Sequence, residues 1–222
     1  MNVYTRVRSL AGMNAHPALL DHIVLATPDL EATVADFARR TGVHPVPGGA
    51  HPDRGTRNYL VSLGGSGYLE IIGPDADQPE PPRPRPFGID RLTGPRTVTW
   101  AISPPDLDKA VADAHAVGYD PGPVSPMSRR RPDGTLLTWR LTSADTAHPS
   151  GLVPFLIDWT GSAHPTEAAL PRTPLLDLSA RTPDPDGVRA LVLALGTALP
   201  LDTGPLRLSF TVDTPRGPVT FT

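Results

Sequence analysis

The 222-residue chain contains no cysteine. This absence excludes a disulfide scaffold, a thiolate zinc site, an iron–sulfur cluster and a cysteine nucleophile. Long apolar runs are missing too, because no stretch approaches the ~18–20 apolar residues that a membrane-spanning helix needs. Residues 1–14 carry Arg6 and Arg8 but lack the apolar segment of a signal peptide. We therefore expect a cytoplasmic protein without a membrane partner.

Lysine is nearly absent. Lys109 is the sole lysine, and the formal net charge is -3 at pH 7. No basic face is apparent, which argues against nucleic acid as the main partner. Hydrophobic residues nevertheless make up 39% of the chain, enough for one large domain or two small ones. The 29 Pro and 20 Gly indicate many turns.

An internal repeat organises the chain. Residues 28–36 and 105–113 agree at six of nine ungapped positions, and residues 182–184 begin a fainter third copy. Each copy follows a short apolar run, which predicts a strand. An Asp then stands where it can cap a helix, and apolar residues follow with helical spacing. The repeat predicts three strand–helix units.

Further strands are expected after each helix. The apolar segments that predict them are 43–46, 58–63 and 68–72, then 119–124, 135–141 and 153–158, then 206–212 and 218–221. The fold class is therefore α+β, with paired βαβββ modules and a shorter C-terminal βαββ half-module. The predicted organisation is an N-terminal extension (1–18), modules 19–73 and 96–160 joined by a Pro-rich linker (74–95) within one domain (19–160), and a half-module (175–222).

Six motifs distributed over residues 19–160 carry a family resemblance. They are LDHIVLA (20–26), GGAHP (48–52), GTRN (55–58), YLEII (68–72), RPDG (131–134) and PFLIDW (154–159). With them the chain resembles the vicinal oxygen chelate superfamily, specifically its glyoxalase-like branch. The resemblance implies paired modules whose sheets curve around a cavity that often holds a divalent metal.

The resemblance also implies where metal ligands would lie. His22 and Glu70 match the ligand positions on the first and last strands of module one. Thr99 and Ile157 occupy the matching positions of module two, and neither side chain is a credible ligand. An incomplete site for Zn, Fe, Mn or Ni is one interpretation, with His51 as a third ligand if its loop covers the cavity. The other is a metal-free cavity in which His22 bonds Glu70 or backbone.

Other polar groups suggest ligand recognition. In the Gly-rich stretch 48–58, His51, Thr56 and Asn58 offer an acid–base group, a hydroxyl and an amide, which suits a small oxygenated molecule. The alternative is a turn in which these side chains satisfy local backbone.

The second half offers aromatic and basic candidates. Trp100, Trp139 and Trp159 could form an aromatic wall, and Trp159 shares the strand phase of Ile157. Trp100, Trp159 and Arg140 are our candidates for ligand binding. The basic run 129–131 is interpreted as a solvated loop, with an inward-directed Arg clamp as the alternative.

Two function classes remain open for a small-molecule cavity. One is a lyase, an isomerase or a ring-opening oxygenase, with Glu70 as general base, His22 as ligand or electrophile, and His51 as a further donor. The other is a binding or sequestration protein of the bleomycin-resistance type. A homodimer is also considered, because the third unit lacks a partner module and its strand edge could pair with another copy.

Overall fold

The strand–helix unit occurs three times in the computed structural model, which describes residues 17–52, 54–142 and 148–222. Each helix begins as the sequence predicts. The side chains of Asp29, Asp106 and Asp184 each accept a hydrogen bond from the backbone N–H three residues later. A carboxylate there satisfies one of the free donors of the first helical turn. The sequence repeat is therefore a repeated helix start.

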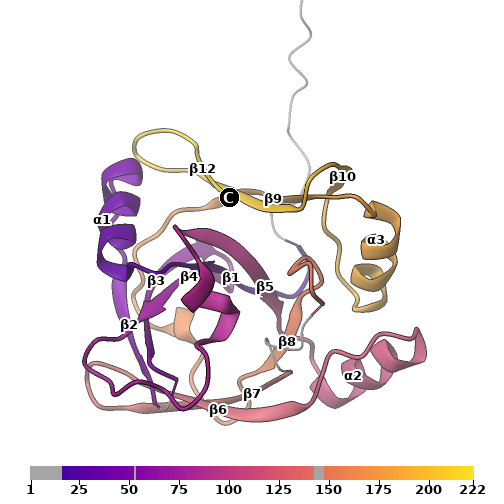
Figure 1. Cartoon of the computed structure of the whole chain (residues 1–222), viewed down its shortest axis with the longest axis horizontal. Coiled ribbons are helices and arrows are strands. Elements are labelled where there is room, and N and C mark those ends of the chain that lie inside the picture. Colours follow the sequence, from indigo (N-terminus) through magenta and orange to yellow (C-terminus); the bar gives the residue numbers. More distant parts are fainter. Residues whose placement is uncertain (1–16, 53, 143–147) are drawn as a thin grey trace, which may run out of the picture.

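The first two units close into one barrel of eight strands (Figure 1). Module one contains β1 (Leu20–Ala26), α1 (Leu30–Thr41), β2 (Val46–His51), β3 (Thr56–Gly64) and β4 (Gly67–Pro74). Module two contains β5 (Arg96–Ile102), α2 (Leu107–Ala116), β6 (Val124–Arg130), β7 (Leu136–Thr142) and β8 (Phe155–Asp158). The order around the barrel is β1-β4-β3-β2-β6-β7-β8-β5. Both modules thus use the same strand order, and the paired α+β architecture is confirmed.

The two modules meet at two unequal seams. Strands β1 and β5 pair antiparallel over six residue pairs, whereas β2 and β6 share the single pair Ala50 and Arg130. At the short seam, a Cβ on Gly49 would lie 2.0 Å from the Arg130 carbonyl oxygen, and φ there is +134°. Only glycine permits this approach. Residues 48–51 of the Gly-rich stretch, which were expected in a loop, therefore belong to strand β2 and help to close the barrel.

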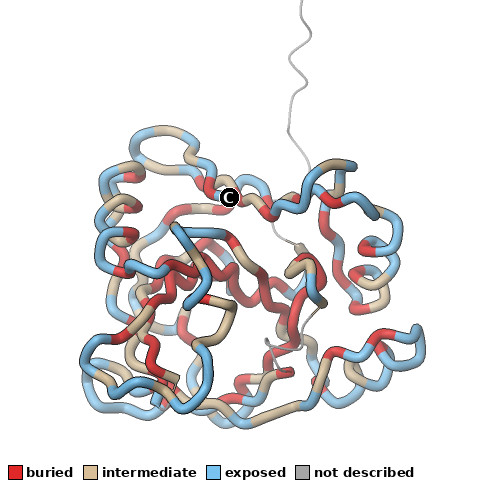
Figure 2. Tube along the Cα trace, in the orientation of Figure 1, coloured by how far each residue is buried: buried red, intermediate tan, exposed pale blue. Residues whose placement is uncertain are grey.

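The strands of the barrel have two differently used faces. In β1, Ile23 and Leu25 belong to the larger apolar cluster, whereas Val24 and Ala26 belong to a second, smaller cluster. This alternation follows from the two-residue period of a strand. Buried residues accordingly concentrate on the barrel strands, and the exposed ones on the outer sides of the helices (Figure 2). The second cluster lies on the inner face of the barrel.

The third unit has the element order of a module but a different sheet. It contains β9 (Leu175–Thr182), α3 (Pro185–Ala194), β10 (Leu201–Thr203), β11 (Arg207–Val212) and β12 (Val219–Phe221). Its strand order is β10-β9-β11-β12, so β9 lies inside the sheet. The sequence did not reveal β10, a strand of three residues. The C-terminal unit thus has three strands after its helix rather than two.

This C-terminal sheet has a partner within the chain. Phe221 stacks on Phe37 of α1 and on Phe210, with ring centroids 5.1 Å apart in each pair. Leu178, Leu208 and other apolar residues of the sheet share one cluster with β1 and β5. The expectation that the third unit lacks an internal partner is therefore wrong. The homodimer itself stays a prediction.

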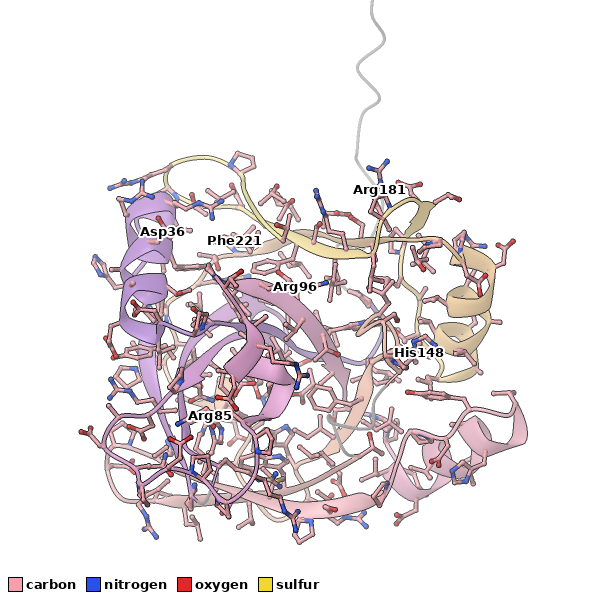
Figure 3. All side chains as sticks on the ribbon, in the orientation of Figure 1. Asp36, Arg85, Arg96, His148, Arg181 and Phe221 are labelled. Carbon is pink, nitrogen blue, oxygen red and sulfur yellow. The ribbon has the colours of Figure 1, made fainter. Side chains whose placement is uncertain are left out.

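The Pro-rich segment 74–95 folds across the mouth of the barrel (Figure 1). Its Arg85, labelled in Figure 3, pairs with Glu80 and Asp90, and a short 3₁₀ segment follows over Pro86–Arg91. Phe87 in that segment has a φ of +60°, a conformation that non-glycine residues rarely adopt. The segment therefore does more than link the modules, because it also contributes side chains to the cavity.

Residues 1–16, most of the expected N-terminal extension, lie outside the described part, and the division into domains stays a prediction. No helix among the described residues is long and apolar enough to cross a membrane. The cytoplasmic location also stays a prediction.

Candidate functional site

The barrel interior contains a cavity of about 280 Å³. Both modules and the Pro-rich segment line it. Module one contributes mainly polar side chains, among them His22, His51, Thr56, Asn58, Tyr68 and Glu70. Module two contributes mainly apolar ones, among them Met127, Trp139, Leu141, Phe155, Ile157 and Trp159. The hollow therefore has one polar and one aromatic wall.

Glu70 is the central acidic group of the polar wall. It lies on β4 and is 7% exposed. Asn58 Nδ2 donates a 2.6 Å hydrogen bond to Oε1. The Nε2 atom of His51 lies 3.8 Å from Oε1, and that of His22 lies 3.8 Å from Oε2. These imidazoles are beyond hydrogen-bond distance, so Asn58 fixes one carboxylate oxygen while the other faces His22.

A buried carboxylate orients His22. Asp21 Oδ1 lies 2.6 Å from His22 Nδ1, and Oδ2 accepts bonds from the Trp159 indole and the His164 ring at 3.0 and 3.1 Å. Burial alone would raise the pKa of Asp21, but the bonds from His164 and His22 outweigh it and lower that pKa. Asp21 is thus an anion, so His22 Nδ1 carries its proton and Nε2 faces the cavity.

His51 is an uncharged imidazole at neutral pH. It ends strand β2, and its Nδ1 lies 3.1 Å from the Thr56 hydroxyl oxygen. Burial lowers its pKa to about 4, assisted by Arg129 and Arg54 and opposed by the nearby Glu70. A neutral imidazole can donate from one ring nitrogen while the other accepts. In the tautomer that accepts from Thr56 at Nδ1, Nε2 carries the proton and is a hydrogen-bond donor toward the cavity.

Arg129 is the main site residue that the sequence interpretation misplaced. It lies on β6, is 2% exposed and lines the cavity, and one terminal nitrogen donates to Asn58 Oδ1 at 3.3 Å. Gly48 makes room for this pair, because a Cβ there would lie 2.2 Å from Asn58 Oδ1 and 2.9 Å from the guanidinium. Burial lowers the pKa of Arg129. The available signal was strand phase, since Ser125, Met127 and Arg129 alternate inward.

Two predicted ligand-binding residues lie elsewhere, and both assignments are corrected. Trp100 is fully buried on the other face of β5, where its indole nitrogen donates to the Leu152 carbonyl oxygen at 2.8 Å. Arg140 points outward from β7 and pairs with Asp108 and Asp158. In both strands the neighbouring position faces inward, so strand alternation turns these side chains away.

The remaining predicted site residues do lie together. Trp159 is on the cavity wall, where its ring centroid is 4.8 Å from that of Trp139. The sequence did not single out Tyr68, whose ring stacks on His22 at 4.8 Å. Desolvation, reinforced by nearby acidic groups, raises the Tyr68 pKa well above its ordinary value, so its hydroxyl stays protonated.

The donor set does not fit a resident divalent metal. Among the described residues, no group of three or more His, Asp or Glu is arranged to hold an ion. From β8 of module two only Phe155 and Ile157 line the cavity, neither of which can bind a metal, and Thr99 does not line it. A catalytic zinc usually needs three protein ligands. The buried cation Arg129 adds electrostatic repulsion beside His51 and Glu70.

Comparisons with known proteins agree with this architecture. A hypothetical protein from Staphylococcus aureus matches with a TM-score of 0.63 at 13% identity, covering 91% of this chain and 98% of that one, which shows a shared fold. Methylmalonyl-CoA epimerase from Mycobacterium tuberculosis gives a TM-score of 0.40 at 19% identity, over 68% of this chain and 94% of that one. A Streptomyces coelicolor methylmalonyl-CoA epimerase variant gives 0.40 at 23%, over 66% and 97%.

The search of curated proteins found no match. The family model described as a glyoxalase-like domain matches residues 20–196, most of the chain. The matched segment includes both modules and continues through α3 of the third unit. The chain therefore belongs to the glyoxalase-like domain family.

Proposed function

We propose that this protein is a lyase or isomerase that moves a proton on a small carbonyl compound without a resident metal. One observation carries the proposal. Glu70 is a buried carboxylate at the cavity, with one oxygen held by Asn58 and the other directed toward the interior. A carboxylate fixed in this way can act as a general base on a bound molecule.

The neighbouring groups have complementary roles. Glu70 takes a proton from the carbon beside the carbonyl, so the C–H bond breaks and an O–H bond forms on the carboxylate. The electron pair moves toward the carbonyl oxygen, which becomes an enolate. Neutral His51 donates a hydrogen bond to that oxygen, and Arg129 offsets its charge. The proton then returns to carbon in an isomerase, or a bond to a leaving group breaks in a lyase.

His22 positions the reacting groups. Its ring is fixed by Asp21 on one side and by stacking on Tyr68 on the other. The Nε2 atom faces the cavity, where it can form a hydrogen bond with a substrate hydroxyl. A ring-opening oxygenase, the third enzyme class considered, receives no support from this donor set, because its chemistry would need a well-held metal.

Binding without chemistry is a second candidate, favoured by the aromatic wall. Trp139 and Trp159 lie with ring centroids 4.8 Å apart, and Phe155 also lines the cavity. Such a surface retains flat apolar molecules whether or not they react. The two candidates differ in whether Glu70 is needed for turnover or merely lines the site.

Hydrogen exchange separates the candidates. Phenylpyruvate, phenylacetone, acetophenone and pyruvate are incubated with the protein in D₂O, and loss of the proton signal beside the carbonyl is followed by NMR. We expect exchange above the buffer rate for at least one compound, abolished in Glu70→Gln and retained in Glu31→Gln, whose carboxylate pairs with Arg57 on the exterior. Absence of Glu70-dependent exchange across all four compounds would overturn the proposal in favour of binding.

A further inference from the structure

Two buried donors on the cavity wall have no hydrogen-bond partner among the described residues. They are Nε of Arg129 and the indole Nε1 of Trp139. The two side chains are 2% and 8% exposed, and both line the cavity. Each N–H group can donate but not accept. Because buried N–H groups are nearly always paired in proteins, an acceptor on a bound molecule would satisfy both donors.

The strand register places Arg129 and Trp139 diagonally across two neighbouring strands. Strands β6 and β7 are antiparallel, with Met127 opposite Trp139 and Arg129 opposite Leu137. Arg129 and Trp139 are therefore diagonal neighbours on the inner face of one sheet. The bond from the guanidinium to Asn58 holds Arg129 in place. One acceptor group with two oxygens can meet both donors, as a carboxylate does.

The charge of the cavity points to an anion. Arg54, Arg83 and Arg129 line it, while Glu70 is the sole acidic residue on its wall among the described residues. His51 adds no charge at neutral pH. The lining therefore has an excess of positive charge, and a cavity of that sign favours negatively charged ligands.

The rest of the module-two wall favours an apolar ligand surface instead of a charged one. Trp139 and Trp159 form an aromatic pair, with Phe155 and Ile157 beside them. The part of the ligand that covers these side chains has to be apolar, and a flat ring makes the best contact with them. The volume of about 280 Å³ suits a molecule with a single ring.

From these observations we infer that the cavity selects a small aromatic carboxylate, whose anionic group is bound by Arg129 and the Trp139 indole. The inference rests on the proposed function, because it names the substrate class of the same cavity. Glu70 is then a base acting on a molecule whose carboxylate is held by the module-two wall. Arg129 sets specificity for charge, and the aromatic pair sets specificity for shape.

Calorimetric titration with matched probes tests the inference. Phenylacetate and phenylacetamide have nearly the same shape, but only the first is charged. We expect phenylacetate to bind about tenfold more tightly, and Arg129→Gln to remove that difference by weakening phenylacetate alone. Arg130→Gln is the control, because this neighbour on β6 is exposed and bonds the Gly134 carbonyl outside the cavity. Equal affinities for the two probes, or no binding of either, would overturn the inference.

A second variant guards against misfolding of Arg129→Gln. Trp139→Phe keeps an aromatic ring but removes the orphan N–H, and it should weaken phenylacetate several-fold while leaving phenylacetamide unchanged. Glu70→Gln separates this inference from the proposed function. It should bind phenylacetate at least as tightly as the original protein while losing hydrogen exchange. If the protein prefers phenylacetate but catalyses no hydrogen exchange, only the proposed enzyme activity is rejected. If it catalyses exchange but binds the two probes equally, only the proposed preference for a carboxylate is rejected.

Discussion

The two halves of the barrel share a backbone but present opposite chemistry. Module one places His22, His51 and Glu70 on the cavity, while module two places Trp139 and Ile157 there. Glu70 pairs with Val24 of β1, and Phe155 pairs with Ala101, which is the equivalent of Val24 at the 77-residue offset of the repeat. Phe155, rather than the expected Ile157, therefore stands at the position of module two that matches Glu70. Because strand alternation fixes which positions face inward, an inward residue can change type without altering the fold. The comparison shows a duplicated scaffold in which one half lines the cavity mainly with polar side chains and the other mainly with apolar ones.

Arg129 is an exception to this division between a polar and an apolar wall. Arg129 is a buried cation within the otherwise apolar wall of module two, and it touches module one through Asn58. Its charge acts on His51 and Glu70 of the polar wall. The two walls are therefore coupled by one guanidinium, and variants on either side should have unequal effects.

The largest expected effect is on turnover. Glu70→Gln should reduce the exchange rate by about 10²–10⁴-fold, because it removes the general base. Ile157→Val, on the last strand of module two, should change that rate by only a few-fold and cost roughly 1 kcal/mol of stability. NMR exchange and urea unfolding measure the two quantities. Similar rate losses in both variants would contradict the division of roles.

Loss of the Asp21 carboxylate should be the largest stability effect. Asp21→Asn replaces an anion that accepts from His22, Trp159 and His164 with an amide that has only one acceptor oxygen. We expect the free energy of unfolding to fall by about 3 kcal/mol. Asp108→Asn, at an exposed residue, should lie within about 0.5 kcal/mol of the original protein. Equal losses of stability in the two variants, measured by urea unfolding, would show that the hydrogen bonds to Asp21 do not stabilise the fold.

His51 should make the protein sensitive to mild acid. Its pKa falls from 6.5 to about 4 on folding, so the unfolded chain binds the proton first. Stability from this group is present above pH 6.5 and is lost as the pH falls toward 4, by roughly 3 kcal/mol in total. His51→Gln should flatten this part of the stability curve, whereas His115→Gln, at an exposed site, should not. Parallel curves for His51→Gln and the original protein would argue against a titrating His51.

Two tryptophans should differ in what their indole nitrogens contribute. Trp100→Phe leaves the buried Leu152 carbonyl without its donor and should cost about 1–3 kcal/mol beyond the loss of packing. Trp139→Phe breaks no hydrogen bond within the described structure, so it should cost less. Thermal unfolding of both variants measures the difference. A larger loss in Trp139→Phe would mean that this indole has a structural partner.

The smallest effect is expected at Arg140. Its ion pairs with Asp108 and Asp158 lie on the exterior, where water and salt screen them. Arg140→Ala should leave the free energy of unfolding almost unchanged and the affinity for phenylacetate unaltered. Calorimetry and unfolding on the same sample give both values. Weaker phenylacetate binding would restore Arg140 as a ligand-binding candidate.

Local signals in the sequence were sufficient for much of the fold. The three Asp caps and the apolar stripes that follow them predict the helices, because capping and helical periodicity involve neighbouring residues. Strand β2 was placed too early and β10 was missed, since a Gly-rich strand and a strand of three residues have little periodicity. Their pairing partners, which are distant in sequence, define them.

The candidate site was less predictable than the fold. His22, Glu70 and Trp159 lie in strands whose phase relates them to known positions of the family, and they do line the cavity. Trp100 and Arg129 were misplaced, because a residue type does not reveal which face of its strand is enclosed. His164 is linked to Asp21 across 143 positions of sequence, and no local pattern predicts such a contact.

The sequence by itself determined the repeated units, their helix starts and the alternation of each strand, because these depend on interactions a few residues long. Only the tertiary structure decided which faces the barrel encloses and which side chains meet there. Closure joins β1 to β5 and β2 to β6, and this long-range pairing sets the polar wall with Glu70 against the aromatic wall with Arg129.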